Sequence, residues 1–235
     1  MISIIIPTLN EEHYLPRLLN SIKKQNFSDY EIIVSDAGSS DKTLIIAQQF
    51  QVKTVVDSTI KHPSAQRNTG AKIAKGDVIL FFDADSELPD NFLASAYQEF
   101  LDKQLKVAGF YIKFNPNKIR YRFYSVISNL ICSLKQYSRN PAAIGAGLMV
   151  SRDIHEKIKG FDLDIVLAED YDYCARATAF GKFRMIKKIR LLYSARRLEK
   201  EGFCQAGWKW FKMGLFTLTN RRIRKQIVKY DFGKF

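Results

Sequence analysis

The sequence predicts an α/β protein with a mostly parallel, twisted sheet that is flanked by helices. Apolar runs rich in β-branched residues alternate with helical patterns through the first 103 residues. The fourth run, at 77–82, is apolar after its first residue, as expected for a strand buried on both faces of a parallel sheet. Polar turns follow these runs directly. This alternation implies right-handed helical crossovers between parallel strands.

The first half of the chain supplies four strands and four helices. Leu15, Leu18, Leu19 and Ile22 recur at helical spacing, and Gly76 stands where a helix is expected to have just ended. Ser40 or Asp41 is expected to cap the second helix. The strands are predicted at 2–6, 31–35, 52–56 and 77–82, and the helices near 15–22, 41–50, 63–75 and 89–103.

The second half continues with strands and helices in a less regular order. Strands are predicted at 107–114, at the end of 143–150 and at 183–193, with helices at 117–136, from 151, at 168–181 and at 202–219. We expect one domain over 1–202, made of two halves at 1–103 and 104–202. Residues 203–235 are expected to form an aromatic and basic helical extension.

The composition limits the partners and the compartment. Lys and Arg outnumber Asp and Glu by 37 to 24, so the net charge of +13 predicts an acidic partner. The cysteines, Cys132, Cys174 and Cys204, are odd in number and far apart, which favours a reducing, cytoplasmic setting. The N-terminus is typical of a strand and not of a signal peptide, and no apolar run reaches the roughly 20 residues of a spanning helix.

Carboxylates stand where strands of the predicted sheet end. Asp83 and Asp85 follow the strand at 77–82, and Asp36 ends the strand at 31–35. Ligands of open parallel sheets bind beyond these strand ends, and two hard oxygen ligands there suit Mg²⁺ or Mn²⁺. Arg67 is on a helix that opens toward the same edge, where it could pair with a diphosphate. The alternative is that the carboxylates only form turns and caps and that Arg67 is solvated.

Four segments in order resemble family 2 glycosyltransferases with the GT-A fold. They read SIIIPTLNEE at 3–12, VSDAGSSD at 34–41, QRNTG at 66–70 and FFDAD at 81–85. The resemblance covers about residues 2–200 and implies that 1–103 is a nucleotide-sugar half and 104–202 an acceptor half. It implies that Pro7 and Glu11 line the nucleotide pocket, Asp36 hydrogen-bonds the base, Arg67 approaches the donor, Asp83 lies near the ribose and Asp85, with Asp83 beside it, coordinates a Mn²⁺ or Mg²⁺ ion on the diphosphate. Ser35 replaces a carboxylate that the family usually has, which loosens the assignment of the base.

Later motifs resemble the acceptor side of the same family. Gly145 and Gly147 match an acceptor loop, and Glu169-Asp170 match an acidic pair. Transfer to a hydroxyl needs a carboxylate within reach of that hydroxyl, so Asp170 is expected to be the base while Glu169 orients the acceptor. Acidic residues at a helix N-terminus are the simpler explanation of this pair. Arg196 and Arg197 resemble a late basic pair that clamps a diphosphate or a lipid phosphate, and a solvated pair is the alternative.

The sequence therefore predicts a metal-dependent, inverting glycosyltransferase of glycan or cell-envelope assembly. Its expected donor is a UDP-sugar or GDP-mannose, and its acceptor is a glycan or lipid-linked hydroxyl or a polyprenyl phosphate. A nucleotidyltransferase and a non-enzymatic basic protein that binds nucleic acid or membrane are the alternatives, but no nucleic-acid motif is present. Aromatic residues at 203–218 precede basic residues at 221–229, so this extension is expected either on the anionic inner face of the cell membrane or packed on the domain.

Overall fold

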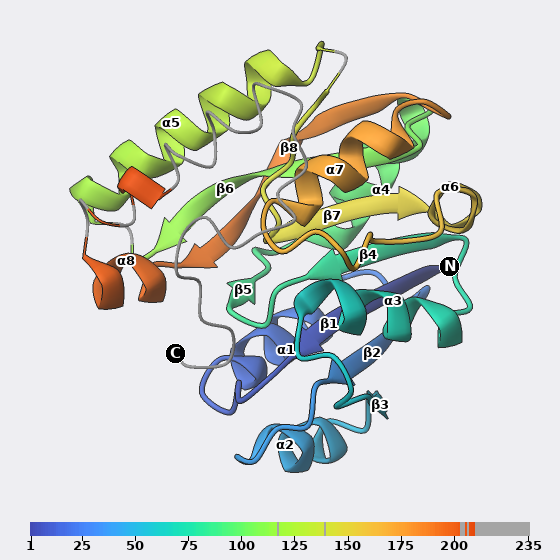
Figure 1. Ribbon diagram of the computed structural model, residues 1–235, viewed down its shortest axis with the longest axis vertical. Coiled ribbons are helices and arrows are strands. Elements are labelled where there is room, and N and C mark those ends of the chain that lie inside the picture. Colours follow the sequence, from blue (N-terminus) through green and yellow to red (C-terminus); the bar gives the residue numbers. More distant parts are fainter. Residues whose placement is uncertain (117, 139, 203–204, 206, 210–235) are drawn as a thin grey trace.

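The computed structural model describes residues 1–116, 118–138, 140–202, 205 and 207–209 (Figure 1). An eight-stranded sheet of order β3-β2-β1-β4-β7-β6-β8-β5 runs through the molecule. The strands are β1 (Ile2–Thr8), β2 (Tyr30–Asp36), β3 (Lys53–Val56), β4 (Val78–Phe82), β5 (Ser86–Glu87), β6 (Val107–Asn115), β7 (Gly147–Ser151) and β8 (Phe183–Ser194). The helices are α1 (Leu15–Lys23), α2 (Thr43–Gln49), α3 (Pro63–Ile73), α4 (Phe92–Asp102), α5 (Ile119–Lys135), α6 (Arg152–Lys157), α7 (Glu169–Ala177) and α8 (Arg196–Glu201).

The first half of the sheet is parallel throughout, as predicted. β1 lies between β2 and β4, and its register pairs Ile5 with Ile33 on one side and with Phe81 on the other. Every residue of β4 is buried, as the continuous apolar run requires. Since β1, β2 and β4 point the same way, their carboxyl ends meet at one edge of the sheet.

The second half of the sheet is mixed. β7 is antiparallel to β4 and β6, and β5 is antiparallel to β8, while β6 and β8 are parallel. The predicted α/β class is confirmed, but the sequence pattern did not show the direction of β7 or the existence of the short β5. The pairing of Ser86 with Tyr193 brings the end of β8 to the end of β4. This pairing places late residues of the chain beside Asp85.

Helices cover both faces of the sheet because successive residues of a strand point to opposite sides. Ile4 packs with Leu18 of α1 and Phe92 of α4 in one apolar cluster. The next residue, Ile5, belongs to the opposite cluster with Tyr173 of α7. α5 lies across β6 at the far end of the sheet (Figure 1).

The extension at 203–235 falls largely outside the described part of the chain. Residues 203, 204, 206 and 210–235 are not described, so its predicted helix and membrane contact are untested. In the described ranges, none of the helices combines the length with the apolar character that crossing a bilayer demands.

Candidate active site

A cavity of about 820 Å³ opens beyond the carboxyl ends of β1 and β4. Ten of the twelve predicted site residues line it, although they come from distant parts of the chain. These residues are Pro7, Glu11, Arg67, Asp83, Asp85, Gly145, Glu169, Asp170, Arg196 and Arg197. The fold thus brings the predicted donor and acceptor residues to one place.

Arg196, the first residue of α8, binds two carboxylates at the rim of the cavity. Its Nη1 and Nη2 donate to the two oxygens of Glu11 at 2.7 and 2.8 Å, and its Nε donates to Asp85 Oδ2 at 2.7 Å. The backbone amide of Ser194 donates to the carbonyl of Asp85 at 3.0 Å and fixes this approach. The guanidinium also lies 4.5 Å from the ring centre of Tyr14.

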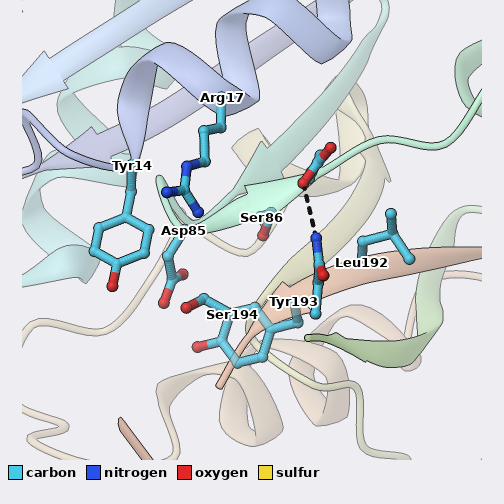
Figure 2. A pocket seen from close by; sticks show the side chains of 9 residues that line it. Tyr14, Arg17, Asp85, Ser86, Leu192, Tyr193 and Ser194 are labelled. Carbon is cyan, nitrogen blue, oxygen red and sulfur yellow. Dashed lines mark hydrogen bonds between the residues drawn. The ribbon is translucent and has the colours of Figure 1, made fainter. Parts of the chain in front are cut away.

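Asp85 is buried and has one carboxylate oxygen to spare. Figure 2 shows its side chain between Tyr14 and Arg17 of the α1 region and Tyr193 and Ser194 at the end of β8. Its Oδ1 has no hydrogen-bond partner among the described residues. Burial raises the pKa of Asp85 to about 7 despite the attraction of Arg196. Burial also raises the pKa of Glu11.

Arg67 of α3 binds two other carboxylates deeper in the cavity wall. Its Nη2 donates to Asp83 Oδ1 at 2.8 Å and its Nη1 to Glu169 Oε1 at 2.9 Å. A longer contact of 3.4 Å joins Nη2 to the carbonyl of Gly145. The side chain of Arg67 is only 3% exposed. Arg67 therefore links three segments, namely the end of β4, the loop that contains Gly145 and the start of α7.

Glu169 and Asp170 are neighbours with opposite pKa shifts. Burial opposes ionisation of both carboxyls, but at Glu169 the charge of Arg67, together with hydrogen bonds from Arg67 and the backbone, outweighs it and lowers the pKa of that residue. Burial, and then the charge of Glu169, raises the pKa of Asp170 to about 8. Ala168 precedes the pair in a left-handed conformation with φ of 58°, and α7 begins directly after it. Asp170 is thus a buried carboxyl that holds its proton near neutral pH.

Gly145 lies against Asp170. A Cβ at this position would be 3.1 Å from Asp170 Oδ2, so the loop approaches the carboxylate closely only because it carries no side chain. Gly145 and Asp170, both predicted on the acceptor side, therefore lie together, while their roles stay predictions.

Two predicted residues lie away from the cavity lining. The carboxylate of Asp36 is fully buried and accepts from Thr8 Oγ1, Ser39 Oγ and the amides of Gly38 and Ser39 at 2.6–2.9 Å. With these four hydrogen bonds Asp36 stabilises the turn after β2, which is the alternative role that the sequence indicated for this residue. Its contact with a nucleotide base stays a prediction. Gly147 faces the core in β7, where a Cβ would lie 2.9 Å from Phe110 and Leu191, so packing explains this glycine.

The prediction missed the apolar wall that α5 adds to the cavity. Phe123, Ile127, Ile131 and Leu134 of this helix line it. The helix itself was predicted, and the spacing of these residues by three or four positions was the available signal.

The family model for glycosyl transferase family 2 matches residues 3–159, about two thirds of the chain. The chain belongs to this family. A Campylobacter jejuni relative named GalNAc(5)-diNAcBac-PP-undecaprenol beta-1,3-glucosyltransferase is 36% identical over 104 residues, which is 42% of this chain and 34% of that protein. Glycosyltransferase AglE of Haloferax volcanii is 27% identical over 189 residues, which is 77% of this chain and 62% of that protein. The chain thus spans about a third to somewhat under two thirds of these relatives' length.

Solved structures share the fold of this family 2 chain. Staphylococcus aureus TarS gives a TM-score of 0.66 at 22% identity and covers 82% of this chain, which corresponds to 36% of TarS. A Pyrobaculum calidifontis mannosyltransferase, solved with GDP-Man and Mn²⁺, gives 0.67 at 21% identity, covering 82% of this chain and 56% of that protein. The chain has the GT-A fold of family 2 glycosyltransferases, as the sequence motifs predicted.

Proposed function

We propose that this chain transfers a sugar, with inversion, from a nucleoside diphosphate sugar to an acceptor hydroxyl in glycan or cell-envelope assembly. One observation carries the proposal. The same cavity holds Asp85, with an unpartnered oxygen in the described structure, and Asp170, a buried carboxyl of raised pKa. The first is suited to the diphosphate side of the reaction and the second to the hydroxyl side.

A divalent cation fits Asp85. A buried carboxylate oxygen without a partner is costly, and a hard cation is one way to satisfy it. Bound Mn²⁺ or Mg²⁺ would neutralise the negative charge of the departing nucleoside diphosphate. In the described part of the chain, no group of three or more His, Cys, Asp or Glu side chains is arranged to hold a metal. The other ligands would therefore be diphosphate oxygens and water, with Asp83 near them.

Arg196 and Arg197 supply positive charge on the same side of the cavity. Glu11 holds the guanidinium of Arg196 through two hydrogen bonds, which fixes its plane. Arg197 also lines the cavity. In the proposed function both residues face the diphosphate of the donor, and Glu11 acts by positioning Arg196.

The pKa of Asp170 bears on the kind of acceptor. A sugar hydroxyl must lose its proton as it attacks, and the deprotonated form of Asp170, which becomes populated as the pH approaches its pKa of about 8, is suited to accept that proton. A polyprenyl phosphate is already ionised at that pH and needs no such base. We therefore favour a hydroxyl, free or on a lipid-linked glycan, over a bare polyprenyl phosphate.

The named relatives support a nucleotide sugar donor without choosing the base. An Escherichia coli relative that is 30% identical over 132 residues is named as using UDP-Glc and an undecaprenol-linked acceptor. The Pyrobaculum mannosyltransferase was solved with GDP-Man. We propose UDP-sugar as donor, with GDP-mannose as the alternative, and a peripheral position at the cytoplasmic face of the membrane.

Donor binding and turnover can be tested separately. Thermal unfolding should be measured with UDP-sugars and GDP-mannose, each with and without Mn²⁺, since a bound donor raises the midpoint by mass action. The donor so found is then incubated with candidate acceptors, and release of UDP or GDP is followed. Absence of any metal-dependent stabilisation by these donors would contradict the proposed function.

A further inference from the structure

Helix α5 presents three different faces around its axis. Tyr121 and Cys132 are buried on the side toward the sheet. Phe123, Ile127 and Ile131 line the cavity. A third face is exposed to solvent. Figure 1 shows that α5 lies on the outside of the molecule.

The third face is an exposed apolar stripe. Ile119, Val126 and Leu130 lie seven and four residues apart, on one line along the helix, and are 84%, 62% and 56% exposed. None of the three is among the residues that line the cavity. A contiguous exposed apolar surface on a helix is typical of an interaction site.

The charge around this stripe identifies the kind of partner. Residues 118–135, which are α5 and its N-cap, contain four Lys or Arg and no Asp or Glu. Arg120 and Arg122 flank the stripe on α5 itself and are exposed. Lys118 also precedes it, although it lies 3.6 Å from Glu199 of α8. An apolar stripe with basic flanks suits a helix that lies in the headgroup region of an anionic bilayer.

The position of the cavity favours a bilayer over another protein. Phe123 and Leu134 are both exposed and part of the cavity lining, so apolar side chains connect the cavity wall with the outer stripe. A helix that rests on a membrane by this stripe places the cavity beside the lipid surface. A lipid-linked acceptor can then enter without leaving that surface.

We propose that α5 is a membrane-docking helix whose stripe of Ile119, Val126 and Leu130 inserts into an anionic leaflet. The choice of a bilayer rests in one step on the proposed function, because a lipid-linked acceptor explains why the cavity and the stripe adjoin. Binding to vesicles, however, does not require donor, acceptor or turnover. Failure of docking and failure of the proposed function are therefore distinguishable.

The full chain should be sedimented with vesicles of phosphatidylcholine alone and with vesicles that also contain about 30% phosphatidylglycerol. This fraction gives the second kind of vesicle a roughly physiological negative charge. The test variant is Ile119→Gln with Val126→Gln and Leu130→Gln, since Gln has a high helix propensity. The matched control is Ile45→Gln with Leu101→Gln and Leu163→Gln, which are 55%, 49% and 47% exposed and lie outside α5. A third variant changes Arg221, Arg222, Arg224 and Lys225 to Gln.

We expect the wild type and the matched control to bind the anionic vesicles, and raised salt to weaken that binding. The α5 variant should lose about tenfold or more of its vesicle partition coefficient, with its circular dichroism unchanged. The proposal is overturned if the α5 variant binds like the wild type while the variant at 221–225 does not. It is equally overturned if the wild type binds no vesicles and is a dimer that the α5 variant converts to a monomer.

Discussion

Two arginines at the cavity each hold two carboxylates, but they leave those carboxylates in different states. Arg67 is almost fully buried, and both of its partners, Asp83 and Glu169, come from ends of core elements. Arg196 is more accessible, and one of its partners, Asp85, keeps an oxygen with no partner in the described part of the chain. The comparison separates a structural ion network from one that is prepared to receive a ligand.

The pKa shifts separate the partners of the two arginines. The pKa of Glu169, which Arg67 binds, is lowered, whereas burial raises the pKa of Glu11 and raises that of Asp85 to about 7 although Arg196 binds both. Asp170 follows Glu169 in the chain, and burial raises its pKa to about 8. Perturbed carboxyls in a cavity are candidates for function. Five predictions test these differences, the first four in decreasing order of effect.

The largest effect is expected on turnover from Asp170→Asn. Removing a general base lowers kcat by about 10²–10⁴. Donor binding should be retained, because Asp170 is placed on the acceptor side. Steady-state kinetics with the identified donor and acceptor measure this, and Asp90→Asn, at an exposed position outside the cavity, is the control. A change confined to KM would assign Asp170 to substrate binding instead.

The next effect is expected on stability from Arg67→Met. This change leaves Asp83 and Glu169 without their cation, and breaking a buried pair costs about 3–5 kcal/mol of unfolding free energy. For a chain of this size the midpoint should fall by roughly 10 °C.

Arg196→Met provides the comparison for that result. This substitution should lower the unfolding free energy by less than half as much as Arg67→Met. Asp85 can take up a proton near neutral pH, and the side chain of Arg196 is more open to solvent than that of Arg67. Equal losses for the two variants in thermal unfolding would remove the distinction between the two networks.

Metal-dependent donor binding should depend on Asp85 and not on Asp170. We expect Asp85→Asn to weaken nucleotide binding in the presence of Mn²⁺ by at least about tenfold, or ~1.4 kcal/mol. Calorimetry with and without Mn²⁺ gives the difference, with Asp170→Asn as the matched carboxyl-to-amide control. Metal-stimulated binding that persists in Asp85→Asn would contradict the metal assignment.

The last prediction concerns the pH dependence of stability. The pKa of Asp170 rises from 3.8 to about 8 on folding, so between these values the folded state binds the extra proton. Stability from this group is therefore present below the lower value and is lost as pH rises through the higher one. Asp170→Asn should raise the unfolding midpoint at pH 8 by roughly 10 °C relative to wild type and have little effect at pH 4. The same gain at both values would show that charge is not its cause.

The sequence predicted the fold and much of the site because both depend on local patterns. The apolar run at 77–82 and the polar turn after it are sufficient to place Asp83 and Asp85 at a strand end. The parallel direction of β1, β2 and β4 then brings Glu11 to the same edge. The family motifs extended this to Glu169 and Asp170.

The pairing of charges could not be predicted in this way. Arg196 is 111 residues from Asp85 and 185 from Glu11, and it reaches them through the antiparallel pairing of the two-residue β5 with β8. No local signal marks such a short strand. For Asp36, the sequence predicted the position at a strand end but not the hydrogen bonds. The carboxylate accepts from Thr8 on the neighbouring strand and from Ser39 in the following turn, and neither contact follows from a local pattern.

The contact between Gly145 and Asp170 restricts how acceptor selectivity can be altered by engineering. A side chain at 145 would start 3.1 Å from Asp170 Oδ2 and would displace the carboxylate that we propose as the base. Ile127 and Ile131 of α5 are partly exposed and line the same cavity. A library that diversifies those two positions would reshape the proposed acceptor side of the cavity without adding a side chain at 145.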